Sequence, residues 1–598
     1  MSGAKGGTKG GPSSKGGKLV VAAIDFGTTY SGYAFSLKNE YIKDPTKVYA
    51  QTKWVAGTGS LMSLKTPTIL LLNKDKTFKA FGYEAENEYG QLAIDGVHED
   101  YYYFRRFKMM LYNSMGLKRD LEITDEFDHK MKALEVFGIA IKYLKDHLMG
   151  CLRNILHDAD DNDLRWVLTV PAIWNDGSKQ FMREAAEIAG IKTDNLIIAL
   201  EPEAASLFCM HLPVEKMKLE GNMSESMRVS PFSKGRKYMV VDVGGGTVDI
   251  TLHEVVDSDK LKELHSANGG AWGGATVDAA YENFLAKITG EKTYKRFKTE
   301  AAEDHIDLLR EFETKKRGVV AGKTGKETIK IPVRLTDLYT EDTGKLLKDR
   351  ISEIPDFKDK VKWLSDKIRM DMEIVKSWYD ESCKNTVKHI KKIFKDTKSQ
   401  GVDTILLVGG FSESPMLQEA IRSNFQDKRL IIPEEAGLVV LKGAVIFGHN
   451  PITIVSRVAK CSYGIRVYRD FKAGVHPENK KVQVGKRVKC KDVFACHVKK
   501  GQELVVGEVQ SKQRYTPLEA DQMTLIFDLY TSTKEDPQYV TDVDCSYLGQ
   551  LEVEVPDLSG GKDRGVFVKL IFGGTEVVVE GEDEKTKKVT KATFDFLQ

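Results

Sequence analysis

Residues 24–29 read IDFGTT and residues 241–249 read VDVGGGTVD. Both stretches share one layout: an apolar run ends on aspartate, a tight turn of glycine and threonine follows, and a second apolar run comes next. Apolar runs that flank a glycine turn are typical of a β-hairpin. Two such hairpins, far apart in the chain and within segments of similar α/β pattern, predict a duplicated α/β domain with a cleft between its halves.

The chemistry of the two turns suits a triphosphate. Glycine leaves backbone N–H groups unobstructed, so they can approach anionic oxygens closely. Thr28, Thr29 and Thr247 add hydroxyl donors. Asp25 and Asp242 can hold a hydrated Mg²⁺, which keeps several waters and takes one or two carboxylates. Either hairpin alone is better explained as an ordinary glycine turn, but the pair in one chain favours a phosphate clamp.

Two further segments extend this pattern. Residues 408–412, VGGFS, lie between a strand and a helix, where a nucleoside can rest on exposed backbone. Residues 201–205, EPEAA, begin a helix, because Pro202 suits the first helical position. Glu201 then lies near positive helix-dipole density, which favours its ionised form. It could orient a water at the γ-phosphate, or it could simply mark a helix start.

Composition excludes several classes of protein. The 598 residues carry 89 basic and 87 acidic side chains, a net charge of +2, so neither nucleic acid nor an anionic membrane is indicated. The basic runs at 105–108 and 388–395 are explained as solvated helix faces. Seven cysteines without a C-x-x-C pair favour a reducing compartment. Because no apolar run is long enough to span a bilayer and residues 1–18 contain no signal-peptide core, we expect a cytoplasmic or nuclear protein.

The pattern along the chain predicts three regions. Residues 1–18, rich in Gly, Lys and Ser, form a disordered tail. Residues 19–455 alternate strands and helices, with helices expected at 101–118, 131–157, 276–317 and 357–398. Residues 456–598 contain short β-branched runs between turn signals, which predict a separate β-rich domain that binds a substrate or partner.

These motifs resemble those of the seventy-kilodalton heat-shock chaperones. The hairpin sequences, WVLTVPAIWNDGSKQFMREAAEIAG at 166–190, IIALEPEAASLF at 197–208 and LLVGGFSESP at 406–415 occur in the order of that family. The resemblance covers roughly residues 19–450 and implies an actin/hexokinase-type ATPase fold with two lobes around a nucleotide cleft. FRRFKMMLY at 104–112 and LKGAVIFG at 441–448 are closest to the divergent type-twelve group, which lacks the standard peptide-binding domain.

The resemblance also implies roles for individual residues. Asp25 and Asp242 would bind the hydrated Mg²⁺, and Asp249 would support the second hairpin. Glu201, Lys108, Asp242 and Thr247 would act in catalysis, with Glu201 positioning the attacking water and Lys108 steadying the γ-phosphate. The phosphate side would comprise Gly27, Thr28, Thr29, Tyr30, Gly244, Gly245, Gly246, Thr247, Gly273 and Gly274. The adenosine side would comprise Glu313, Lys316, Arg317, Gly409, Gly410 and Phe411. Pro171 and Lys179 would form the switch between the cleft and the partner domain.

Three departures from the family pattern concern binding and coupling. Phe411 and Glu413 replace a serine and the arginine that stacks on adenine, so a cation has become an anion. Val320 replaces a serine near the sugar. PITIVSRVAKCSYGIRV at 451–467 stands where the family has an apolar-acidic linker, and no helical lid follows. Coupling to J-domain helpers and standard peptide clamping are therefore not carried over.

The resemblance implies a chaperone-like, stress-response ATPase. It would bind Mg-ATP or Mg-ADP, hydrolyse ATP slowly, and couple the nucleotide state to a client protein or another partner at the β-rich domain. One alternative is a nucleotide-gated interaction module without significant hydrolysis. Another is an actin-like filament protein, since bacterial relatives of actin share the EP-x-A-A motif. A sugar kinase is a further option on fold grounds alone.

Overall fold

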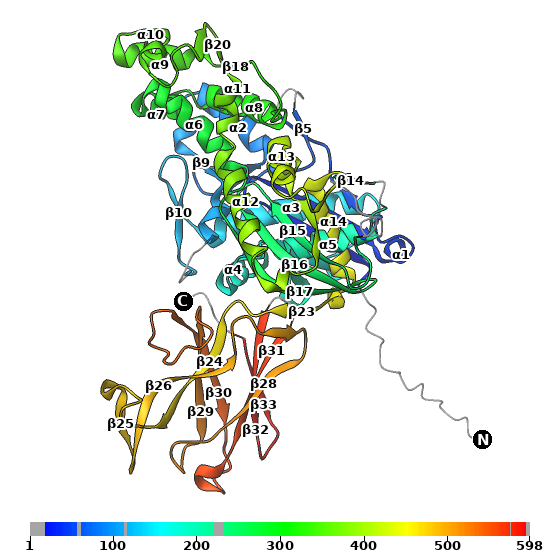
Figure 1. Ribbon diagram of the computed structural model, residues 1–598, viewed down its shortest axis with the longest axis vertical. Helices are drawn as coiled ribbons and strands as arrows, with labels where there is room; N and C mark the ends of the chain where they lie inside the picture. Colours follow the sequence, from blue (N-terminus) through cyan, green and yellow to red (C-terminus); the bar gives the residue numbers. More distant parts are fainter. Residues whose placement is uncertain are drawn as a thin grey trace, which may run out of the picture.

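The computed structural model describes residues 18–56, 61–112, 117–213, 216–220, 231–573 and 576–593. Apart from Lys18, the tail predicted for residues 1–18 lies outside these ranges. Two large mixed sheets with helices around them form the body of the molecule, and the C-terminal strands gather at one end of it (Figure 1).

The first sheet has the strand order β13-β12-β1-β2-β3, with β6 also paired to β2. Its strands are β1 (Val20–Phe26), β2 (Tyr30–Leu37), β3 (Tyr49–Ala50), β6 (Thr66–Pro67), β12 (Leu164–Val170) and β13 (Leu196–Leu200). All seven residues of β1 are buried, because this central strand is covered on both faces. β1 pairs antiparallel with β2 and parallel with β12, so Asp25 lies opposite Gly32 on one side and Thr169 on the other.

The second sheet repeats this arrangement within an eight-stranded order, β14-β22-β21-β15-β16-β17-β23-β27. β15 pairs antiparallel with β16 and parallel with β21, so Asp242 lies opposite Asp249 and Val408. Both predicted hairpins are thus confirmed, and each aspartate is the next-to-last residue of a strand that lies between a hairpin partner and a parallel neighbour. The strands are β14 (Met217–Glu220), β15 (Lys237–Val243), β16 (Val248–Asp257), β17 (Lys260–Gly270), β21 (Val402–Val408), β22 (Arg429–Pro433), β23 (Ile454–Val458) and β27 (Glu503–Val505).

Two helices lie between the sheets. α5 (Glu201–His211) and α14 (Ala436–His449) share one buried cluster with Val21 and Ala23 of β1 and with Tyr238 and Val240 of β15. On the other face of the first sheet, α3 (Ala133–Arg153) and α4 (Asp176–Ile188) pack against Ile24 and Phe26. α3 confirms the helix predicted at 131–157, with bounds shorter at both ends.

Smaller elements surround this body. Near the first sheet are α1 (Lys38–Tyr41), β4 (Trp54–Ala56), β5 (Leu61–Ser63), β7 (Ile69–Leu72), β8 (Phe78–Phe81), α2 (Tyr83–Ile94), β9 (Tyr102–Arg105), β10 (Glu122–Thr124) and β11 (Lys130–Lys132). Around the second are α6 (Ala275–Thr289), α7 (Glu291–Glu300), α8 (Ala302–Arg317), β18 (Lys326–Lys330), α9 (Val333–Thr343), α10 (Leu347–Glu353), β19 (Val361–Leu364), β20 (Lys367–Asp371), α11 (Met372–Ser377), α12 (Asp380–Ile393) and α13 (Pro415–Asn424).

Two helix predictions were wrong in part. Within 101–118, Tyr102–Arg105 is strand β9 and Phe107–Leu111 forms a 3₁₀ helix, while residues 113–116 lie outside the described ranges. Pairing of β9 with β7 decided this, because the backbone of β7 offers hydrogen bonds that a local helix would leave unused. Within 357–398, β19 and β20 precede the helices. In β20 the buried residues Ile368 and Met370 alternate with exposed ones, which is a strand period.

From β24 onward the described chain forms two antiparallel sheets around a core of their own. One sheet contains β24 (Ser462–Asp470), β25 (Lys481–Val484), β26 (Arg487–Val498), β29 (Thr524–Ser532) and β30 (Cys545–Glu554), and the other β28 (Val509–Tyr515), β31 (Val566–Gly573), β32 (Glu576–Asp583) and β33 (Val589–Thr593). The predicted boundary at 455/456 falls inside β23, and β27 pairs with β23, so the second sheet extends across that boundary.

Candidate functional site

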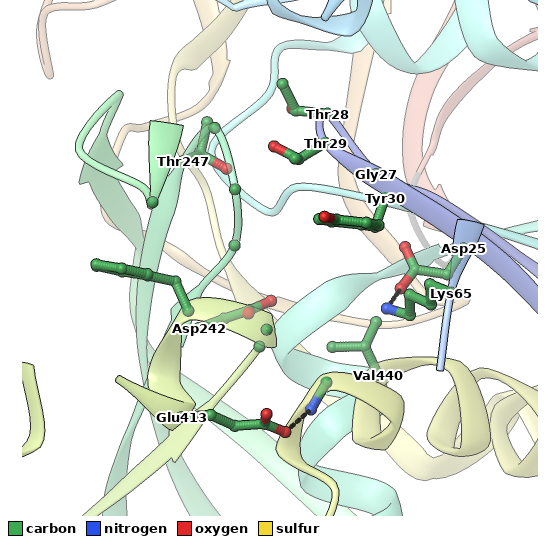
Figure 2. Close-up of a pocket in the computed structure, with 18 of the residues that line it drawn as sticks. Asp25, Gly27, Thr28, Thr29, Tyr30, Lys65, Asp242, Thr247, Glu413 and Val440 are labelled. Atoms are coloured by element: carbon green, nitrogen blue, oxygen red, sulfur yellow. Dashed lines mark hydrogen bonds and ion pairs between the residues drawn. The ribbon is translucent and has the colours of Figure 1, made fainter. Parts of the chain in front are cut away.

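The two aspartate hairpins meet at one cavity of about 300 Å³. Figure 2 shows Asp25, Thr28 and Thr29 on one side of this cavity and Asp242 and Thr247 on the other. Every site residue predicted from the sequence except Gly273 lines it: Asp25, Gly27, Thr28, Thr29, Tyr30, Lys108, Glu201, Asp242, Gly244, Gly245, Gly246, Thr247, Gly274, Glu313, Lys316, Arg317, Gly409, Gly410 and Phe411. Gly273 supports the wall from behind, since its N–H donates to the carbonyl of Gly246 at 3.2 Å.

The glycine turn of the second hairpin touches the threonines of the first hairpin. A Cβ atom on Gly245 would lie 2.1 Å from Oγ1 of Thr29, and one on Gly246 would lie 2.6 Å from Oγ1 of Thr28. Only glycine allows this approach, because real Cβ atoms do not come so close to another heavy atom. Oγ1 of Thr29 is buried and has no hydrogen-bond partner among the residues that the structure describes, so the cradle presents an unsatisfied hydroxyl.

Asp25 is held by a lysine that the motifs did not indicate. Its carboxylate accepts hydrogen bonds from Nζ of Lys65 at 2.5 Å and from the hydroxyl of Thr169 at 3.0 Å. Figure 2 shows the Lys65 contact at the edge of the cavity. Burial acts to raise the pKa of Asp25, but the charges of Lys65 and Lys108 and these hydrogen bonds hold it below its ordinary value.

Asp242 has the opposite environment. It is 4% exposed, and within the described part of the chain its carboxylate has no hydrogen bond or ion pair. Burial, followed by repulsion from Glu201, Asp249 and Asp25, raises its pKa well above the ordinary value. The cavity therefore contains an excess of buried carboxylate charge.

Lys108 and Glu201 form a pair at the floor of the cavity. Nζ of Lys108 lies 3.2 Å from Oε1 of Glu201 and 4.9 Å from the ring centroid of Trp174. Burial is the largest influence on Glu201 and raises its pKa to about 7, although Lys108 acts against that rise. Glu201 can therefore gain or lose a proton near neutral pH, and its neighbour in this change is Lys108.

These observations fit a magnesium–nucleotide complex. A divalent cation would relieve the repulsion among the buried carboxylates, and phosphate oxygens would satisfy Thr29 and the turn N–H groups. No set of three or more His, Cys, Asp or Glu side chains that could hold a metal occurs among the described residues. Two aspartates suit Mg²⁺, because this ion keeps several waters and takes further ligands from phosphate.

Comparison with known proteins gives the family. The family model described as "Hsp70 protein" matches residues 105–354. Heat shock 70 kDa protein 12A of Mus musculus is 34% identical over 97% of this chain and 92% of its own length. Heat shock 70 kDa protein 12A of Homo sapiens is 33% identical over 97% of this chain and 92% of its own length. Heat shock 70 kDa protein 12B of Homo sapiens is 33% identical over 97% of this chain and 91% of its own length.

The chain belongs to the Hsp70 family. This membership carries the actin/hexokinase-like ATPase fold, and it indicates a nucleotide-binding, chaperone-like function. It confirms the resemblance found in the sequence, including the likeness to the type-twelve group. In the part of the chain that the structure describes, no helix combines the length and apolarity needed to cross a membrane.

Two of the departures from the Hsp70 pattern, Phe411 and Glu413, line the cavity. The ring of Phe411 lies 6.3 Å from that of Tyr379 and is nearly parallel to it. Oε1 of Glu413 accepts from the N–H of Gly437 at 3.2 Å, a contact drawn in Figure 2. Val320 is 42% exposed and is not among the residues that line the cavity.

Sequence motifs missed Lys65, Asp278 and Val440, which also line the cavity. Asp278 accepts from Lys316 at 2.6 Å and from Arg106 at 3.0 Å, so it joins the two sides of the cleft. It follows shortly after Gly273 and Gly274, and that proximity was the signal available. Lys65 directly precedes β6, and the pairing of β6 with β2 brings it to the site. No local pattern in the sequence predicts that pairing.

Proposed function

We propose that this protein is a chaperone-like nucleotide switch. Two lobes, each centred on one of the large sheets, hold Mg-ATP in the cleft between the hairpins and hydrolyse it slowly. The nucleotide state is passed to a C-terminal β-rich domain at 456–598, which binds a client or another partner. One observation supports this most directly: both aspartate hairpins line one cavity that contains an unsatisfied hydroxyl and a carboxylate without a hydrogen bond or ion pair.

In this proposal the two turns bind phosphate. The hydroxyls of Thr28, Thr29 and Thr247 and the N–H groups of the glycine turns donate to phosphate oxygens. Asp242 and Asp25 hold Mg²⁺ through its waters, and the ion supplies charge neutralisation at the phosphates. Ionised Glu201 orients the attacking water, and Lys108 stabilises charge at the γ-phosphate. Positioning and electrostatics account for such a reaction, without a covalent intermediate.

The proposed coupling has a physical route. Oδ1 of Asp249 accepts from the N–H of Ile173 at 2.7 Å. Nζ of Lys460, just after β23, donates to the carbonyls of Ala172 and Trp174 in the same loop. One short loop thus contacts both the second hairpin and the first residues beyond the second sheet. A shift of the hairpin on nucleotide binding would move the anchor of Lys460.

A second contact supports the same route. Arg457 of β23 forms two hydrogen bonds with the carboxylate of Glu203, at 2.8 and 2.6 Å. Glu203 belongs to α5, the helix that begins with Glu201. A paired, buried arginine–carboxylate contact has a fixed geometry, so it transmits movement of the helix.

The decisive test of binding is calorimetric titration of ATP with and without Mg²⁺. Asp242→Asn keeps the shape and removes the charge, so we expect the gain in affinity from Mg²⁺ to fall by about tenfold or more. Asp257→Asn is the matched control, since Asp257 is exposed at the far end of β16. Equal Mg²⁺ dependence in all three proteins would contradict the proposed metal site.

Hydrolysis is tested separately by phosphate release. Glu201→Gln and Lys108→Ala should each lower turnover by about tenfold or more, because each removes an interaction made at the reacting phosphate. The ion pair between Lys65 and Asp25 favours a second candidate function, a nucleotide-gated interaction module without significant hydrolysis. Asp25 is one of the two proposed Mg²⁺ ligands, so a metal ion must displace Lys65 before it can bind there. Nucleotide binding without phosphate release above the background of the Glu201→Gln protein would support this second candidate.

A further inference from the structure

A second hollow, of about 990 Å³, lies between α12 and α13 and shares no lining residue with the nucleotide cavity. We call it the α12–α13 groove. It is lined by Trp272, Ala321, Tyr379, Asp380, Cys383, Lys384, Asn385, Val387, Lys388, His389, Lys391, Lys392, Lys395, Met416, Glu419, Ala420, Ser423 and Asn424. Part of this set belongs to the run at 388–395, which the sequence alone explained as a solvated helix face.

The groove has a basic wall. Five of its lining residues are lysines, and they recur at three- and four-residue spacing along and just beyond α12, so they share one face. Among the described residues, Lys388, Lys392 and Lys395 form no ion pair. The two acidic lining residues are already engaged: Asp380 accepts from Lys384 at 2.8 Å and Glu419 from Arg422 at 2.5 Å.

The rest of the groove is apolar. Val387 of α12, Met416 and Ala420 of α13, and the ring of Trp272 all line it. His389 packs against Trp272 at 5.3 Å, and its Nε2 atom is buried without a hydrogen-bond partner. The groove therefore combines unpaired positive charge with an apolar surface and an unsatisfied polar atom.

This combination selects one kind of occupant. A nucleic-acid backbone would use the lysines but would leave the apolar surface exposed. A protein segment with carboxylates on one side and apolar side chains on the other would meet both features. We propose that the α12–α13 groove is a docking site for an acidic, amphipathic segment of a partner protein.

Fluorescence anisotropy on the full-length protein tests the proposal. The probe is a labelled synthetic peptide of aspartate, glutamate and leucine in amphipathic order, and a peptide with lysine in place of the acids serves as the comparison. We expect the acidic peptide to bind and the basic one not to bind. Binding should weaken about tenfold or more in the triple variant Lys388→Glu, Lys392→Glu, Lys395→Glu.

The matched control reverses three exposed lysines at another site, Lys358→Glu, Lys360→Glu and Lys362→Glu. It changes the net charge equally and should leave peptide affinity within about twofold. Equal loss in both triple variants would overturn the proposal, because the attraction would then depend on net charge alone. Tighter binding of a single-stranded oligonucleotide, lost in the α12–α13 variant, would also overturn it and assign the groove to nucleic acid.

A steric variant tests the apolar part. Ala420→Trp fills the groove without changing its charge, so it should weaken the acidic peptide as much as the charge reversal does. Unchanged affinity would show that the peptide does not enter the groove and would contradict the proposal. Melting temperatures of all variants identify any that fail to fold, and the lysine variants keep the test valid if Ala420→Trp does not fold.

Discussion

At the scale of single residues, the cleft is defined by groups that lack partners. Oγ1 of Thr29 is buried without a hydrogen bond, and the carboxylate of Asp242 is buried among other carboxylates. Unsatisfied buried polar groups destabilise a folded protein by about 1–3 kcal/mol each. Their presence together in one cavity indicates a site shaped for a charged ligand rather than for stability.

Gly245→Ala should separate the two hairpins. The new Cβ would lie 2.1 Å from Oγ1 of Thr29, so the turn or the threonine must move. We expect Mg-ATP affinity to fall by about tenfold or more, because the phosphate cradle loses its geometry. Calorimetric titration measures the effect. Gly150→Ala is the control, since a Cβ there meets nothing within 4 Å; an equal loss in that variant would contradict the argument.

The raised pKa of Glu201 predicts a pH dependence of stability. In the folded protein this pKa rises from 4.5 to about 7, so between these values the folded state binds more protons than the unfolded state. Stability from this group is complete below pH 4.5 and is lost as pH rises towards 7, by up to about 3 kcal/mol. Glu201→Gln should lack this loss.

The measurement is the melting temperature of both proteins, without nucleotide, across that pH range. The difference in melting temperature, wild type minus Glu201→Gln, should decrease as pH rises. A constant or increasing difference would show that the folded protein does not favour protonated Glu201.

At the scale of elements, the crossing of α5 and α14 positions Glu201. A Cβ atom on Gly443 of α14 would lie 1.7 Å from the carbonyl oxygen of Ala204 in α5, so the two helices touch backbone to backbone. A Cβ on Gly448, near the end of α14, would lie 2.4 Å from Cγ1 of Val21 in β1. Glycines on α14 thus let this helix pack closely against both α5 and the first sheet.

Gly443→Ala tests this packing. The added methyl group must push α14 away from α5, and overpacking of this kind costs about 1–3 kcal/mol. We expect a lower melting temperature by calorimetry, together with weaker Mg-ATP binding because Glu201 moves with α5. Retention of both properties would show that the crossing adapts without moving the site. Gly150→Ala again provides the control for adding a methyl group to a helix.

Elements also show why local prediction failed at two places. Residues 102–105, 361–364 and 367–371 form strands because neighbouring strands provide backbone partners and a buried face. The alternation of Ile368 and Met370 with exposed residues was present in the sequence, but a helix was predicted across it. For β9 no such simple alternation was available, since Tyr103 and Phe104 are both buried.

At the scale of the whole molecule, the C-terminal sheets contact the body next to the cleft, in addition to the pairing of β27 with β23. Tyr463 donates to Asp176 at 3.3 Å, and Lys460 donates to the loop that also holds Asp249. Figure 1 shows these sheets below β23, at one end of the molecule. Polar contacts of this kind suit an attachment that changes with the ligand state.

Lys460→Met should uncouple the two parts. If the loop at 171–175 relays the nucleotide state, Mg-ATP should change amide hydrogen exchange in β24 of the wild-type protein. The variant removes the hydrogen bonds to Ala172 and Trp174 but keeps a long side chain, so it should lose that change while still binding Mg-ATP. An undiminished change in the variant would exclude Lys460 from the relay. Lys472→Met, at an exposed site beyond β24, is the control.

The sequence by itself determined the two hairpins, the family and most of the residues that line the cavity. Glycine contributes backbone freedom there, and threonine and aspartate contribute hydroxyl and carboxylate groups. These properties belong to the residues themselves, so a local sequence motif is enough to identify them. Only the tertiary structure revealed Lys65 beside Asp25, the tie between Asp278 and Arg106, and the α12–α13 groove. These features depend on strand pairing and helix packing between segments that are distant in the sequence. The free energy of such contacts depends on which residues the fold brings together, and the residues adjacent in sequence do not determine it.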